Sequence, residues 1–149
     1  MVVLHTTHTN MLAKAISITA QAFENTLDKG GYPYMLHCLR VWDGVKHLSE
    51  DVQCAAIMHD LKEDAPEVWE KHMLLFSSKT RSLVNTLTHY PTETYDNYIK
   101  MISLSKDATK IKLSDLKDNS DITRLKGLTK KDFDRLERYS RSYVYLSKI

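Results

Sequence analysis

The residues best suited to chemistry lie in the stretch HDLKED at positions 59–64, which follows an apolar segment. Glu63 is four positions beyond His59 and Asp64 is four beyond Asp60, so on a helix the four side chains would form two stacked pairs. Carboxylates at the C-terminal end of a helix oppose the helix dipole, which favours cations there. Local helix stability therefore does not account for this cluster, whereas a bound metal ion would.

A helix must position this cluster, and the sequence predicts one from Ser49, a suitable N-cap residue, to Pro66, which closes it. Within it, Ala55, Ala56 and His59 repeat with the spacing of a buried helical face. We therefore expect His59 to point toward the protein interior and not toward solvent.

Helical spacing dominates the rest of the chain. The other helices are predicted at about 12–23, 35–45, 66–73, 79–88, 94–103, 107–118 and 129–147. The last one begins with Thr129 and Asp132 in a pattern that resembles a capping box, with aspartate in place of glutamate. No strand pair and no internal repeat is evident. The predicted fold class is therefore all-α, a single-domain bundle of seven to eight helices over residues 1–149.

Composition limits the classes of function. The chain has 21 Lys and Arg against 19 Asp and Glu, a net charge of +2, which argues against non-specific nucleic-acid binding but leaves small polyanions open. No apolar run approaches the ~20 residues of a membrane span, and no signal peptide is evident. Cys38 and Cys54 lie in apolar helical contexts that are typical of buried thiols. We expect a cytoplasmic protein with no membrane and no nucleic-acid partner.

Candidate metal ligands come from three predicted helices. His37 near the start of the second and Asp115 on the penultimate helix supply the same donor types as His59 and Asp60. Imidazole and carboxylate together suit Mn²⁺, Fe²⁺ or Zn²⁺ better than Ca²⁺. Two histidines and two carboxylates leave coordination positions for water and substrate, as in catalytic sites. A buried histidine is also commonly a core residue with its hydrogen bonds satisfied, so spacing alone leaves both interpretations open.

Three segments, GYPYMLH at 31–37, AAIMHDLKED at 55–64 and IKLSDLKDN at 111–119, resemble in order the signature segments of the HD-domain alarmone hydrolases. This family comprises the hydrolase half of the RelA/SpoT enzymes and the stand-alone small alarmone hydrolases, including those of metazoans. The resemblance runs from about Phe23 to Arg124. It implies a helical HD fold, and a chain of this length would lack a synthetase domain and would only degrade the alarmone.

The resemblance also implies roles for single residues. Glu63 and Asp64 match the Glu-Asp dyad that orients the attacking water and moves its proton, and Asn119 matches an asparagine of the substrate pocket. The reaction implied is hydrolysis of the 3′-pyrophosphate of guanosine tetra- or pentaphosphate, ppGpp or pppGpp, to GDP or GTP and pyrophosphate. Mn²⁺ is the usual ion of the family, and its implied ligands are His37, His59, Asp60 and Asp115.

Cationic side chains flank these segments and are expected to neutralise phosphates, with a solvated surface position as the alternative for each: Lys29, Arg40, Lys62 and Lys112. Lys29 has the best support, because the family places a basic residue in this loop. Asp28 stands where the family usually carries an arginine that packs on guanine. Asp121 replaces another arginine, for which Arg124 could substitute.

The departures at Asp28 and Asp121 leave two alternatives open. One is an HD-fold phosphatase acting on another nucleotide, such as a nucleoside monophosphate or the 2′-phosphate of NADPH. The other is a non-catalytic HD domain that binds a nucleotide or a protein. The remaining histidines, His89 among them, match no motif.

Overall fold

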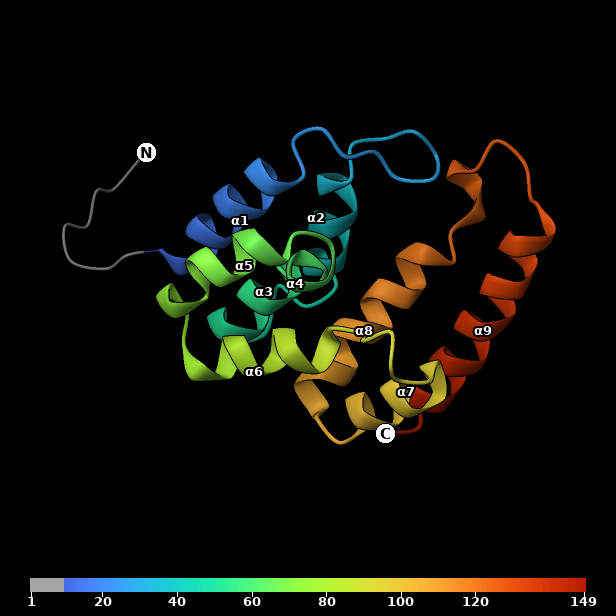
Figure 1. Ribbon diagram of the computed structural model, residues 1–149. Coiled ribbons are helices and arrows are strands. Elements are labelled where there is room, and N and C mark those ends of the chain that lie inside the picture. The colour runs from blue at the N-terminus through green and yellow to red at the C-terminus, as the bar shows by residue number, and fades with distance from the viewer. Residues whose placement is uncertain (1–9) are drawn as a thin grey trace.

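The computed structural model describes residues 10–149, and this part of the chain is helical, with no β-strand beyond an isolated bridge between Leu27 and Pro33 (Figure 1). The predicted all-α class is confirmed. The helices are α1 (Met11–Ala22), α2 (Met35–Asp43), α3 (Glu50–Ile57), α4 (Leu61–Asp64), α5 (Pro66–His72), α6 (Ser78–Leu87), α7 (Tyr95–Ser103), α8 (Lys106–Asn119) and α9 (Lys130–Leu146). Short 3₁₀ turns follow α5 and α8 at Met73–Leu75 and Ile122–Arg124.

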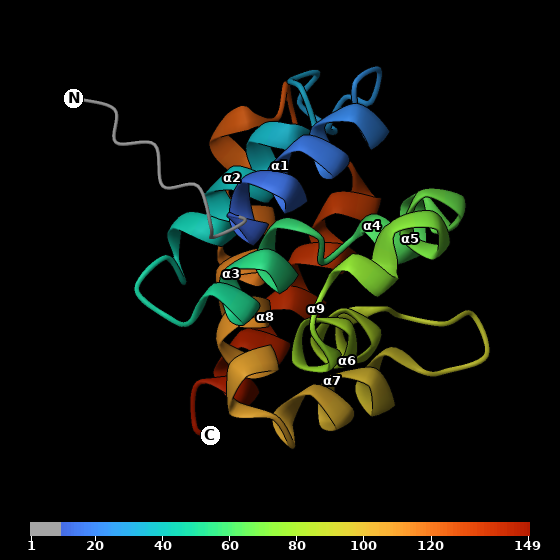
Figure 2. The same cartoon turned by 90° about the vertical axis from the view of Figure 1, so that its left-hand side faces the viewer.

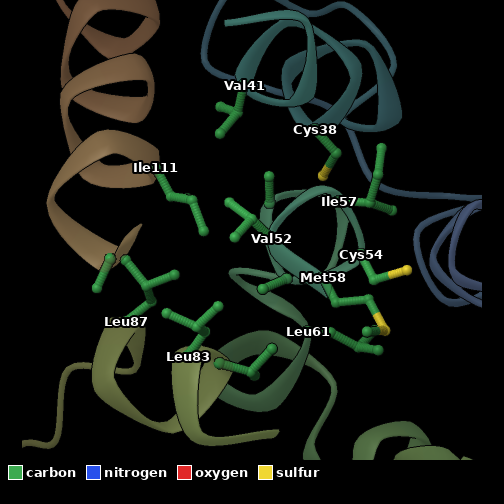
Figure 3. Packing of buried hydrophobic residues seen from close by; sticks show 14 of the residues in the cluster. Cys38, Val41, Val52, Cys54, Ile57, Met58, Leu61, Leu83, Leu87 and Ile111 are labelled. Atoms are coloured by element: carbon green, nitrogen blue, oxygen red, sulfur yellow. The ribbon is translucent and has the colours of Figure 1, made fainter. Parts of the chain in front are cut away.

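The prediction of one continuous helix through positions 59–64 is wrong, because the helix is interrupted between Ile57 and Leu61. Residues 58–60 form a turn between α3 and α4, in which the Leu61 amide donates to the Met58 carbonyl oxygen at 2.9 Å. Met58 and His59 are adjacent and both buried. The turn directs Met58 into the apolar core (Figure 3), whereas His59 Nε2 lies 3.3 Å from His37 Nε2 of α2. Asp60 and Asp64 nevertheless stay one helical turn apart, since the Asp64 amide donates to the Asp60 carbonyl oxygen at 2.9 Å.

α3 is the central element of the bundle. It packs against α1, α2, α6 and α8, and five of its eight residues are buried: Val52, Cys54, Ala55, Ala56 and Ile57. Figure 3 shows Val52 and Ile57 among side chains from α2, α6 and α8. A helix that is apolar on most sides is a core helix, so the turn that follows α3 is anchored by close packing.

α2 and α8 approach each other closely at Gly44. A Cβ atom added there would lie 2.2 Å from Ser114 Oγ on α8, and that hydroxyl donates to the Val41 carbonyl oxygen at 2.9 Å. Only glycine fits this approach. The contact matters because α2 carries His37 and α8 carries Asp115.

α9 closes the other side of the molecule. It packs on α8 and α7, while α1, α3 and α5 lie in the opposite half (Figures 1 and 2). Its start is fixed by the capping box predicted between Thr129 and Asp132. No helix among residues 10–149 has the length and apolar character needed to cross a bilayer.

Candidate metal centre and active-site cavity

Four side chains from α2, the 58–60 turn and α8 converge on one point. His37 Nε2 lies 3.3 Å from both His59 Nε2 and Asp115 Oδ1, and His59 Nε2 lies 3.0 Å from Asp60 Oδ2. Ligands of one first-row ion, each about 2.0–2.2 Å from it, have neighbours at about this separation. His37, His59 and Asp115 are buried. The donor set, two imidazoles and two carboxylates, fits a divalent transition ion.

Hydrogen bonds behind the two rings set which nitrogen faces the cluster. His37 Nδ1 bonds to Asp118 Oδ2 at 2.7 Å, and His59 Nδ1 bonds to the Ala56 carbonyl oxygen at 2.8 Å. When each ring is neutral, its proton stays on Nδ1 and the lone pair of Nε2 points into the cluster. Both rings are therefore oriented as metal ligands.

The charges of the cluster also favour a metal site. Burial lowers the pKa of both histidines, but neighbouring carboxylates outweigh it and raise the pKa of His37 to about 11 and of His59 to about 9. Burial likewise opposes ionisation of Asp60 and Asp115, yet the histidines hold the pKa of Asp60 well below its usual range, and Lys112 with the histidines does the same for Asp115. Without a metal the cluster holds protons, which a divalent cation would displace.

Further side chains fix the carboxylates. The Tyr34 hydroxyl donates to Asp60 Oδ2, and the Tyr34 ring packs edge-on against Phe23 at 5.0 Å between centroids. Burial and the Asp60 charge raise the pKa of Tyr34, so its hydroxyl remains a donor. Asp115 is held by Lys112 Nζ at 2.7 Å and by Asn119 Nδ2 at 2.6 Å.

Three members of this cluster, His37, Asp60 and Asp115, line a cavity of about 840 Å³. Glu63 and Asp64 line it, and the Glu63 carboxylate accepts a 3.0 Å hydrogen bond from the backbone N–H of His89. Partial burial, together with the charges of Asp60 and Glu63, raises the pKa of Asp64 to about 6. A carboxylate with this pKa is suited to general-base chemistry near neutral pH.

Of the comparisons with known proteins, the one with solved structures gave a match. No family model matches the chain, and no curated protein matches its sequence. A solved structure of a metazoan orthologue of SpoT, which hydrolyses ppGpp and plays a role in starvation responses, superimposes with a TM-score of 0.76 at 21% identity over 95% of this chain and 88% of that chain. The chain has the fold of that hydrolase. At this identity the likeness is one of fold, and the activity must be argued from the residues of this chain.

Lys29 and Arg124, both expected to bind substrate, line the cavity. Lys112 and Asn119 line it too, but their polar atoms are directed at Asp115. Arg40 is not among the lining residues. Its guanidinium lies behind His37, with Nε 2.6 Å from Asp118 Oδ1.

The loop that carries Asp28 is built around this side chain. Asp28 Oδ1 accepts the backbone N–H groups of Gly30 at 2.8 Å and Tyr32 at 2.9 Å, and Oδ2 lies 3.9 Å from Arg124 Nε. Gly31 in the same loop has a φ of 85°, which suits glycine. The position that carries an arginine in the resembling family is thus a carboxylate at the wall of the cavity.

Sequence reasoning missed several lining residues, above all Arg135, Arg138 and Tyr139 of α9, and also His89. The Arg138 guanidinium lies 4.8 Å from the centre of the Tyr95 ring. The α9 residues occupy positions i, i+3 and i+4, so their common helical face was present in the sequence. That this face covers the cavity depends on the packing of α9 against α7 and α8, which no local pattern indicates.

Proposed function

We propose that this protein is a divalent-metal-dependent hydrolase of nucleotide pyrophosphates that converts ppGpp or pppGpp to GDP or GTP and pyrophosphate. The observation that carries the proposal is the cluster of His37, His59 and Asp115, with Asp60 beside both histidines, next to a cavity that Glu63 and Asp64 also line. The fold shared with a ppGpp hydrolase supports it. Such an enzyme would act on a cytoplasmic nucleotide pool and lower a starvation signal of the stringent-response type.

The ion would be held by His37, His59, Asp60 and Asp115, and we propose Mn²⁺. When bound, it would supply positive charge that polarises a phosphoryl oxygen and makes water more acidic.

The carboxylate dyad performs the proton chemistry in this scheme. Glu63 is anchored at one oxygen by the His89 N–H, which leaves the other oxygen to orient a water molecule. Asp64, with its pKa raised to about 6, accepts the proton of that water and returns it to the leaving group. Tyr34 keeps Asp60 in place throughout, because its hydroxyl remains protonated.

The cations of the cavity favour a highly phosphorylated substrate. Lys29, Arg124, Arg135 and Arg138 all line it, although the chain as a whole carries a net charge of only +2. Partial burial and nearby Arg135 lower the pKa of Lys29, which indicates that the positive charges gather in one place. Arginine forks bind phosphate oxygens in pairs. The cavity volume of about 840 Å³ suits a nucleotide with phosphates at two positions.

One observation favours a second candidate, hydrolysis of another phosphate ester such as the 2′-phosphate of NADPH. Asp28 occupies the place where an arginine would pack on guanine, and both of its oxygens are engaged, by backbone N–H groups and by Arg124. Packing of an arginine at position 28 on guanine is therefore absent from the scheme. The substrate test must include such esters.

The deciding experiment measures Mn²⁺-dependent product release from ppGpp beside NADPH, GTP and a deoxynucleoside monophosphate. Pyrophosphate and GDP from ppGpp alone would support the proposal. Phosphate from another substrate would favour the second candidate. Bound metal without turnover of any of these would indicate a domain that binds nucleotide or protein without catalysis.

A further inference from the structure

One carboxylate outside the ligand set, Asp118, makes ionic contacts with three side chains, as many as the ligand Asp115 makes. Asp118 Oδ2 accepts from His37 Nδ1 at 2.7 Å, and Oδ1 accepts from Arg40 Nε at 2.6 Å. Arg124 donates to the same side chain at 3.1 and 3.3 Å and to the Asp118 carbonyl oxygen at 2.9 Å. Three cationic or potentially cationic side chains thus share this one carboxylate.

These three partners belong to two different parts of the site. His37 is a member of the metal cluster, and Arg124 lines the cavity. Arg40 belongs to neither and neutralises the carboxylate from behind. The Asp118 side chain is 9% exposed, so its contacts are shielded from solvent.

We propose that Asp118 is a positioning residue for both the metal centre and the part of the cavity wall that carries Arg124. It holds His37 with Nε2 toward the metal, and it holds the Arg124 guanidinium where this group meets a phosphate. The inference rests on the proposed function in taking the cluster to bind a divalent ion and the cavity to bind phosphate. It assigns both tasks to one residue that touches neither metal nor substrate. Loss of Asp118 would therefore weaken two binding events at once.

Asparagine cannot replace this residue. A carboxylate accepts hydrogen bonds at both oxygens, whereas an amide offers one oxygen and one NH₂ group. In Asp118→Asn, the NH₂ group would face a donor of His37, Arg40 or Arg124. Replacing the partner of a ligating histidine costs about 10- to 100-fold in metal affinity.

The matched control is Asp121→Asn. Asp121 Oδ2 lies 3.2 Å from Arg124 Nη1, and among the ionic contacts of the described residues it has none with a histidine of the cluster. Co²⁺ binding is followed by its visible absorption, and inorganic pyrophosphate binding to the metal-free protein by calorimetry. Asp118→Asn should weaken Co²⁺ binding by about 10- to 100-fold and pyrophosphate binding as well. Asp121→Asn should leave Co²⁺ binding at the wild-type value, because Asp121 contacts Arg124 but neither histidine of the cluster.

Three results would overturn the proposal. The first is wild-type Co²⁺ affinity in folded Asp118→Asn, and the second is an equal loss of Co²⁺ affinity in Asp121→Asn. The third is a wild-type protein that binds Co²⁺ but no pyrophosphate, which removes the Arg124 half of the role. A wild-type protein that binds no Co²⁺ would overturn the proposed function together with the inference, so the two failures are distinguishable.

A second variant at the cavity wall tests the inference even if Asp118→Asn does not fold. In the Zn²⁺-loaded protein, Arg124→Gln should move the Nδ1–H resonance of His37, because its acceptor has lost a cationic partner. The Nδ1–H resonance of His59, which donates to the Ala56 carbonyl oxygen, should stay in place. An unmoved His37 resonance would show that the two sites are independent and would overturn the proposal.

Discussion

Replacing Asp64 by asparagine should make the metal-free protein more stable at neutral pH while removing its catalytic base. The reason is electrostatic repulsion. Asp64 is on α4 beside Glu63 and near Asp60, and the charges of these two carboxylates oppose its ionisation. Asparagine has nearly the same shape and no charge, so it relieves the repulsion without leaving a cavity.

The magnitude follows from the pKa. Partial burial and the two carboxylates raise the pKa of Asp64 from 3.8 to about 6. At ~1.36 kcal/mol per unit this corresponds to at most about 3 kcal/mol, and solvent screening of an exposed side chain reduces it to about 1 kcal/mol. The folded protein binds this proton more tightly than the unfolded chain does. The contribution to stability is therefore full below pH 3.8, declines as the pH rises, and is lost above about pH 6.

The assay is urea unfolding of chelator-treated wild-type protein and Asp64→Asn across this pH range. The variant should gain about 1 kcal/mol at pH 7 and nothing at pH 4. Exposed Asp134 on α9 provides the control, because Asp134→Asn should show no such pH-dependent gain. A gain of equal size at both pH values, or none at pH 7, would refute the electrostatic reasoning. Saturating Mn²⁺ should reduce the difference, since a cation relieves the same repulsion.

Other changes test the remaining parts of the site. Asp60→Ala should abolish stoichiometric metal binding; elemental analysis that finds full metal content would remove Asp60 from the ligand set. Glu63→Gln should retain metal and lower turnover by roughly 10²- to 10⁴-fold, and near-native turnover would exclude it from catalysis. Arg138→Ala should raise KM for a polyphosphorylated nucleotide more than it lowers kcat, as steady-state kinetics would show. Gly44→Ala should destabilise the fold by about 1–3 kcal/mol in urea unfolding, because its Cβ would lie 2.2 Å from Ser114 Oγ; an unchanged midpoint would contradict the close approach of α2 and α8.

The all-α class was readable from the sequence because helical periodicity is local. The inward direction of His59 was readable for the same reason, since it continues the buried spacing of Ala55 and Ala56. The interruption at 58–60 was not, because the spacing of apolar residues continues through it. The turn is decided by tertiary packing, which buries Met58 in the apolar core and His59 beside His37.

The site was predictable to the extent that it depends on residue type. The structure brings together the four residues expected as ligands, and it places Lys29 and Arg124 at the cavity. Lys112 was expected to contact a phosphate. It lies three residues before Asp115 on α8, however, and this spacing also favours the ion pair that is observed.

The parts that sequence could not supply depend on contacts between distant segments. Asp118 is 81 residues from His37, and their hydrogen bond exists because Gly44 lets α2 approach α8. The arginines of α9 reach the cavity only because α9 packs against α7 and α8.

Rigid apolar packing and electrostatic strain are combined in this molecule. α3 fixes the 58–60 turn through a core of small and branched side chains, so Asp60 stays close to Asp115 and Asp64 although these carboxylates repel one another. The carboxylates of the cluster are balanced in part by Lys112, by the Arg40 and Arg124 contacts of Asp118, and by protonated histidines. A divalent ion would replace those protons and relieve the repulsion at Asp64. Metal binding should therefore stabilise the folded chain, by about 2.7 kcal/mol when the free ion is at 100 times its Kd.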